Sequence, residues 1–165
     1  MTDPFQILLI NGSTREPSYT RTLTTKVQEA LIERGAQTIL WDLRNSPLPI
    51  ANPEFHSDPE QHTNPKVRRF VVHASNADAF VLASPIYHNS YSGTLKNALD
   101  HLAIAQFYYK PVALLSHGGD AVRRQSITCG LLYAAYAEQP SQLRFAPDWR
   151  IIATMVRTVI SWCRL

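Results

Sequence analysis

Cysteine is scarce in this sequence, and long apolar runs are absent. Two cysteines occur among 165 residues, and Cys129 and Cys163 have neither the density of a disulfide scaffold nor the spacing of metal ligands. No stretch reaches the roughly 18 uninterrupted apolar residues that a membrane-spanning helix needs, and the first residues lack the basic segment of a secretory signal. These absences predict a soluble cytoplasmic protein without a metal site or a membrane partner.

Charge of one sign is not concentrated anywhere along the chain. The formal net charge is +3 and the pI is near 9.0, but the basic residues are scattered, with short pairs only at Arg68-Arg69 and Arg123-Arg124. This mild positive balance fits an anionic small molecule as well as a polymer, and we expect no nucleic-acid partner. Because a domain has about 150 residues, we expect one domain over residues 1–165 and one site.

The glycine-rich nucleotide signatures are also missing, although the segment ILLINGSTREPSYTR passes from an apolar run to a polar turn as such sites do. A P-loop needs a second glycine followed by lysine, and a dinucleotide fingerprint needs three glycines, whereas this turn has Gly12 alone. The turn offers a tight bend, hydroxyls, arginines and a helix start with free amides, a set sized for one phosphate such as that of FMN. These groups belong to Ser13, Thr14, Arg15, Ser18, Thr20 and Arg21.

Apolar runs and helical stripes alternate along most of the chain. Short runs rich in Val, Ile and Leu predict strands buried on both faces, and apolar residues at helical spacing between them predict helices. This alternation requires right-handed parallel crossovers, so we predict an α/β sandwich of three layers. The predicted strands are 5–11, 37–43, 78–84 and 110–116, and helices begin at Thr20, Pro65 and Thr94, with a further helix over 121–138 and a short strand over 143–145.

The sequence gives more specific predictions for the first helix and for residues 44–64. The first helix is expected to end before Gly35. Residues 44–64 contain four prolines and are expected to form a long functional or mobile loop. His56 and His62 in this loop suggest a metal site, but a solvated loop is the better interpretation. The inner face of the first helix is predicted to carry Leu23, Val27, Ala30 and Leu31.

Three polar, glycine-bearing loops follow the first, third and fourth predicted strands: GSTREPSYTR, PIYHNSYSG and HGG. Open parallel sheets bind ligands at the carboxyl ends of their strands, so these loops are expected to converge. The second loop offers Tyr87 and the backbone amides of residues 86–89 to a flat ring. The glycines of the third loop let the backbone approach a ligand closely.

Each loop alone has a plainer interpretation. Ser18 or Thr20 could cap a helix whose arginines are solvated. Tyr87 and Tyr91 could be surface aromatics in an ordinary turn, and a glycine pair often marks a plain turn. The coincidence of three such loops after three core strands favours a flavin site.

Together the loops resemble the NADPH-dependent FMN reductase family, flavodoxin-like proteins that include quinone, azo-dye and chromate reductases. The resemblance runs from about Phe5 to Gly119, with G-S-x-R-x-x-S in the first loop and P-x-Y-x-x-S-x-x-G-x-L-K-N-A-x-D from Pro85. It implies a flavodoxin-like three-layer α/β/α fold with a parallel sheet in the order 2-1-3-4-5, and a homodimer or homotetramer. Carried over by position, it implies an FMN phosphate held by Ser13, Arg15, Ser18, Thr20 and Arg21, and a ring lined by Pro85, Ile86, Tyr87, His88 and Asn89 and closed by Ser116, Gly118 and Gly119. Lys96, Asn97 and Asp100 match the family's helix and are expected to be structural.

The activity that the resemblance implies is a two-step reduction. NADPH or NADH transfers hydride to bound FMN and leaves, and a quinone, azo compound, free flavin or metal oxyanion then takes its place. The cofactor carries this chemistry, so no catalytic side chain is expected.

Two other functions stay open, an electron-carrier flavodoxin and a flavin-free binding protein on the same scaffold. The basic charge disfavours the electron carrier, because an acidic surface usually steers such proteins to their partners. The tail after about residue 140 departs from the family's pattern, through divergence or through a changed reading frame.

Overall fold

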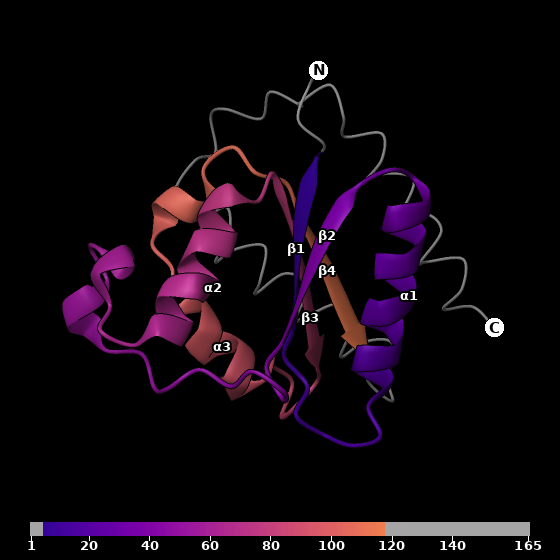
Figure 1. The fold of residues 1–165 in the computed structure, drawn as a ribbon. Helices are drawn as coiled ribbons and strands as arrows, with labels where there is room; N and C mark the ends of the chain where they lie inside the picture. The colour runs from indigo at the N-terminus through magenta and orange to yellow at the C-terminus, as the bar shows by residue number, and fades with distance from the viewer. Residues whose placement is uncertain (1–4, 118–165) are drawn as a thin grey trace. The chain divides into compact units, whose positions relative to one another are not determined.

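The computed structural model describes residues 5–117, so the helix predicted over 121–138 and the strand predicted over 143–145 lie outside the described residues. Within them, four strands form one parallel sheet in the order β2-β1-β3-β4 (Figure 1). This order confirms the parallel α/β fold, and the single domain expected over residues 1–165 stays a prediction. The strands are β1 Gln6–Asn11, β2 Gln37–Asp42, β3 Ala79–Pro85 and β4 Val112–His117.

Within the same residues, α1 covers one face of the sheet, and α2 and α3 cover the other (Figure 1). Ser18, Asn64 and Ser92 precede these helices, and each side chain accepts a hydrogen bond from a first-turn amide that would otherwise lack a partner. Pro65 is the first residue of α2, as predicted. No helix in the described part is long and apolar enough to cross a membrane. The helices are α1 Tyr19–Glu33, α2 Pro65–Asn76 and α3 Gly93–Leu99, with short 3-10 helices at Pro53–Phe55, Pro59–Gln61 and Ile104–Phe107.

The core lies along β1 and β3, each of which has a strand on both sides. All the residues of β3 are buried. Successive side chains of a strand point to opposite faces, so Leu8 and Ile10 of β1 join the cluster beneath α2 and α3, whereas Ile7 and Leu9 face the side that α1 covers. This packing fixes the positions at which β1 and β3 end.

The inner face of α1 differs from the predicted one. Val27 and Leu31 are buried as expected, but the other two predicted residues are only partly buried. Thr20 and Thr24 take the inner positions instead. The Thr24 hydroxyl donates to the Thr20 carbonyl at 2.8 Å, so this threonine is buried without losing its hydrogen bond. A pattern built on apolar residues alone does not reveal such a face.

The segment 44–64 is anchored to the helices beside it. His62 is buried and lies 5.5 Å from His101 between ring centroids, so the solvated-loop interpretation is wrong for this histidine. Asn97 Nδ2 and His101 Nε2 both donate to the Pro49 carbonyl, at 2.7 and 2.9 Å, which gives Asn97 the expected structural role. Among residues 5–117, no three His, Cys, Asp or Glu side chains are grouped to hold a metal ion.

Acidification is expected to destabilise the fold through His62. Burial lowers the pKa of His62 below its ordinary 6.5, with smaller contributions from His101 and Arg68, and its Nδ1 accepts a hydrogen bond from the Asn64 amide at 3.0 Å. Below pH 6.5 the unfolded chain takes up the proton first, so stability is full above this pH and falls as the pH drops toward the folded pKa. Urea midpoints measured between pH 7.5 and 5 should therefore decrease, less steeply in His62→Gln and unchanged in slope in the exposed His56→Gln control. Equal slopes in all three proteins would refute this assignment.

Candidate functional site

The loops that follow β1 and β3 meet at one edge of the sheet. The hydroxyls of Ser92 and Thr94 both donate to the Gly12 carbonyl at 2.7 Å. The Ile86 amide donates to the His117 carbonyl at 3.2 Å and so joins the second loop to the end of β4. The convergence expected from the sheet topology is therefore observed for the described residues.

The serines of the first loop are bonded to each other. Ser18 Oγ donates to Ser13 Oγ at 2.7 Å and accepts from the Arg21 amide at 3.1 Å. The Asn11 side chain accepts from the Ser13 amide at 3.3 Å and donates to Asp42 Oδ1 at 3.2 Å. Both serines and Asn11 are buried. The loop's own side chains thus set its conformation, and Ser18 is a helix cap as well as a candidate ligand.

The start of α1 offers donors that the described chain does not use. The amides of Tyr19 and Thr20 donate to no acceptor among residues 5–117, as is usual in the first turn of a helix. Arg15 is exposed and forms no ion pair with any described residue. Free amides, the positive end of the helix dipole and a nearby guanidinium are the features of an anion site.

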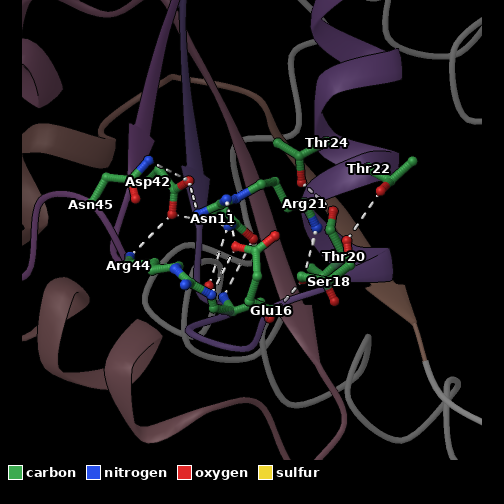
Figure 2. Close-up of polar contacts among 11 residues, drawn as sticks. Asn11, Glu16, Ser18, Thr20, Arg21, Thr22, Thr24, Asp42, Arg44 and Asn45 are labelled. Atoms are coloured by element: carbon green, nitrogen blue, oxygen red, sulfur yellow. Dashed lines mark hydrogen bonds and ion pairs between the residues drawn. The ribbon is translucent and has the colours of Figure 1, made fainter.

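Arg21, in contrast, lies within a chain of four charges (Figure 2). Its Nη2 lies 2.6 Å from Asp42 Oδ2, and its Nη1 lies 3.3 Å from Glu16 Oε2. The same Glu16 oxygen lies 2.8 Å from Nη1 of Arg44, which follows β2. We call Glu16, Arg21, Asp42 and Arg44 the charge network. It joins the first loop to the carboxyl end of β2, and the sequence did not predict it.

The second loop forms a tight hairpin. Tyr87 and Ser90 exchange two backbone hydrogen bonds of 2.9 Å. Between them, His88 and Asn89 have φ angles of 50° and 63°, the left-handed backbone that both central residues of a type I′ turn require. The Ile86 and Tyr87 amides are thus used within the chain. The His88 and Asn89 amides donate to no acceptor among the described residues, so two of the four amides expected to face a ring are free to do so.

The ends of β3 and β4 lie side by side. Pro85 pairs with His117 in parallel register, and Ser116 precedes His117. The His117 ring stacks on Tyr19 with centroids 4.8 Å apart, which brings the end of β4 against the start of α1. The remaining predicted ligands, Gly118 and Gly119, lie outside the described residues.

Some residues that shape this site were not among the predicted ones. Asn11 and Asp42 are polar residues at the carboxyl ends of neighbouring strands, and this position could have revealed them. Arg44 lies in a turn with no distinguishing pattern. Ser92 caps α3 and also fixes the first loop through Gly12.

The arrangement combines a candidate anion site with an exposed hairpin at the carboxyl edge of a parallel sheet, close to where the strand order reverses. Ligands bind at this position in open α/β sheets, and fold and site together define a flavodoxin-like domain. The sequence model of the NADPH-dependent FMN reductase family matches residues 5–135. The chain belongs to this family.

Two similar curated proteins are azo-dye reductases. The FMN-dependent NADPH-azoreductase of Staphylococcus saprophyticus is 34% identical over 121 residues, which cover 73% of this chain and 64% of that protein. The NADPH azoreductase of Bacillus sp. (strain OY1-2) is 34% identical over 114 residues, which cover 69% of this chain and 59% of that protein. The chain therefore spans less than two thirds of the length of these two relatives.

Solved structures have the same fold. An NADH:FMN oxidoreductase in its apo form is 26% identical with a TM-score of 0.64, covering 77% of this chain and 65% of that one. The flavoenzyme NAD(P)H:(acceptor) oxidoreductase FerB from Paracoccus denitrificans has a TM-score of 0.65 at 19% identity, covering 87% of this chain and 81% of that one. The second likeness supports the fold alone.

Proposed function

We propose that this protein is an FMN-dependent NAD(P)H oxidoreductase that reduces a small-molecule acceptor such as an azo compound, a quinone, a free flavin or a metal oxyanion. Family membership and the names of the similar azoreductases support this proposal. The single observation that carries it is that the first loop, with donors that residues 5–117 leave unused, meets the exposed hairpin at one sheet edge. A cytoplasmic homodimer or homotetramer completes the proposal and rests on the family resemblance.

The first loop fits the phosphate of FMN. The amides at the start of α1 and the Arg15 guanidinium, which have no partner among residues 5–117, would meet a dianion within a loop that its own serines already order. Charge-assisted hydrogen bonds of this kind are about twice as strong as neutral ones. We propose that Ser13, Arg15, Ser18, Thr20 and Arg21 hold the phosphate.

The hairpin fits the isoalloxazine ring. The His88 and Asn89 amides, which donate to no acceptor in the described part of the chain, would donate to its polar edge, and Tyr87, whose side chain is exposed, would contact its face. The left-handed backbone at both central residues keeps these amides in a fixed orientation. We propose that the ring is lined by Pro85, Ile86, Tyr87, His88 and Asn89 and closed by Ser116, Gly118 and Gly119.

When bound, FMN would supply the redox chemistry by accepting a hydride from NADPH or NADH and passing the electrons to the acceptor. The chain's own residues bind and orient it, and none is assigned to proton transfer. Buried contacts around Gly12 hold the two loops in a fixed relative position. Such preorganisation lowers the cost of ordering a bound ligand.

Anaerobic reduction tests the proposal directly. The purified protein is expected to take up FMN in equimolar amount, and the yellow absorbance is expected to bleach when NADPH or NADH is added. Addition of an azo dye or a quinone should then restore the flavin colour. Bound FMN that neither nucleotide reduces would contradict the reductase assignment and favour an electron carrier. A folded protein that takes up no FMN would favour a flavin-free binding protein.

A further inference from the structure

One carboxylate of the first loop lies between two arginines. Oε2 of Glu16 is 3.3 Å from Arg21 Nη1 and 2.8 Å from Arg44 Nη1, and Figure 2 shows Glu16 among these side chains. The Glu16 side chain is 57% exposed, so it can leave this position without disturbing the core. The carboxylate of Glu16, on a surface loop, thus forms ion pairs with two arginines beside the proposed phosphate site.

Arg21, one of the two arginines that pair with Glu16, has N–H donors without hydrogen-bond acceptors among the described residues. Arg21 Nη2 lies 2.6 Å from Asp42 Oδ2, but the angle is not that of a hydrogen bond. Arg21 Nε and Nη2 are both buried and have no hydrogen-bond acceptor among the described residues. A buried guanidinium normally has acceptors for its donors, so this site has capacity for a further anion.

We propose that Glu16 is an internal competitor of the cofactor phosphate for Arg21 and Arg44, and that Arg44 is a further phosphate-recognising residue. The inference rests on the proposed function and deepens it. A phosphate dianion brings more charge and more acceptor oxygens than one carboxylate, so it can displace Glu16 from both arginines. Glu16 thereby limits the affinity of the loop for phosphate-bearing ligands.

An alternative role for Glu16 predicts the opposite result. If the Glu16 carboxylate only stabilised the loop, its removal would loosen the loop and weaken phosphate binding. Glu16→Gln keeps the side-chain size and one oxygen acceptor but removes the charge. The sign of the change in affinity therefore separates competition from support.

The test compares Glu16→Gln with Glu29→Gln, which removes the same charge from the exposed Lys26 pair on α1. Dissociation constants are measured for FMN, riboflavin and inorganic phosphate. We expect Glu16→Gln to bind FMN and phosphate about threefold or more tightly than the unchanged protein, with riboflavin affinity unchanged and no effect in Glu29→Gln. Arg44→Gln in the Glu16→Gln background should abolish the gain.

Three outcomes would overturn the inference: unchanged or weaker phosphate binding in Glu16→Gln, an equal gain in Glu29→Gln, or a gain that persists without Arg44. Inorganic phosphate separates this inference from the proposed function. If phosphate binds more tightly to Glu16→Gln but FMN binds to neither protein, the competition stands and the flavin assignment fails. If FMN binds to both with equal affinity, the flavin assignment stands and the competition fails.

Discussion

Replacing Gly12 by alanine is expected to lower the free energy of unfolding by about 1–3 kcal/mol. A Cβ at this position would lie 2.8 Å from both Leu95 Cβ and Ser92 Oγ, and 3.1 Å from the Ala83 carbonyl oxygen. Two of these atoms are a backbone oxygen and a Cβ, which cannot move without moving β3 or the start of α3. We expect the change to force the first two loops apart and to weaken FMN binding as well.

Gly93 provides the matched control. No atom of the described residues lies within 4 Å of a Cβ built there, and Gly93 is the first residue of α3. Gly93→Ala should leave stability unchanged or raise it by up to about 1 kcal/mol, because alanine favours helix and restricts the unfolded chain. Urea denaturation followed by tryptophan fluorescence measures both variants. Equal stability of the two alanine variants would show that the contact between the loops is not tightly packed.

Gly12 also illustrates what sequence reasoning can and cannot predict. The tight turn after β1 was predicted from the glycine itself, but the need for glycine there comes from Ser92 and Leu95, which are distant in the sequence. Gly35 is the opposite case: no atom of residues 5–117 crowds it, and its φ of +86° explains why a glycine follows the end of α1. Local signals of this second kind predicted most element boundaries.

Signals that depend on contacts between distant segments were missed. The inner face of α1 includes Thr20 and Thr24, and the Thr24 hydroxyl is buried with its hydrogen bond made to the Thr20 carbonyl, which an apolar pattern does not reveal. His62 was assigned to a solvated loop because its neighbours in the sequence are polar. Its buried ring packs against Phe55 nearby in the sequence and against His101, which lies beyond the end of α3.

The same distinction between local and long-range signals applies to the candidate site. Sheet topology was sufficient to predict that the first and second loops meet, because the carboxyl ends of parallel strands lie at one edge. Side-chain pairing was not predictable, and Arg21 is an example. Its sequence position suggested a cation facing a ligand, but its ion pairs with Asp42 and Glu16 arise because the end of β2 and the first loop meet the first turn of α1.

Arg15 is the second position where a large effect is expected. Arg15→Ala should weaken FMN binding by about 1.5–3 kcal/mol, the range for a hydrogen bond to a charged group, which is roughly a 10- to 150-fold rise in Kd. The reason is that Arg15, unlike Arg21, is exposed and forms no ion pair with a described residue. Its guanidinium can therefore meet a phosphate without breaking an existing contact. Fluorescence titration of flavin into the purified protein measures the change.

Two control measurements test whether the effect of Arg15→Ala on affinity depends on the phosphate of FMN. Riboflavin has the same ring without the phosphate, so its affinity should be the same in Arg15→Ala and the unchanged protein. Arg34→Ala removes an equal charge at the far end of α1, where the side chain bonds only the Ala30 carbonyl among the described residues, and should leave FMN binding unchanged. An FMN affinity that Arg15→Ala does not alter would place the phosphate elsewhere. Equal losses for FMN and riboflavin would instead indicate that Arg15 contacts the ring.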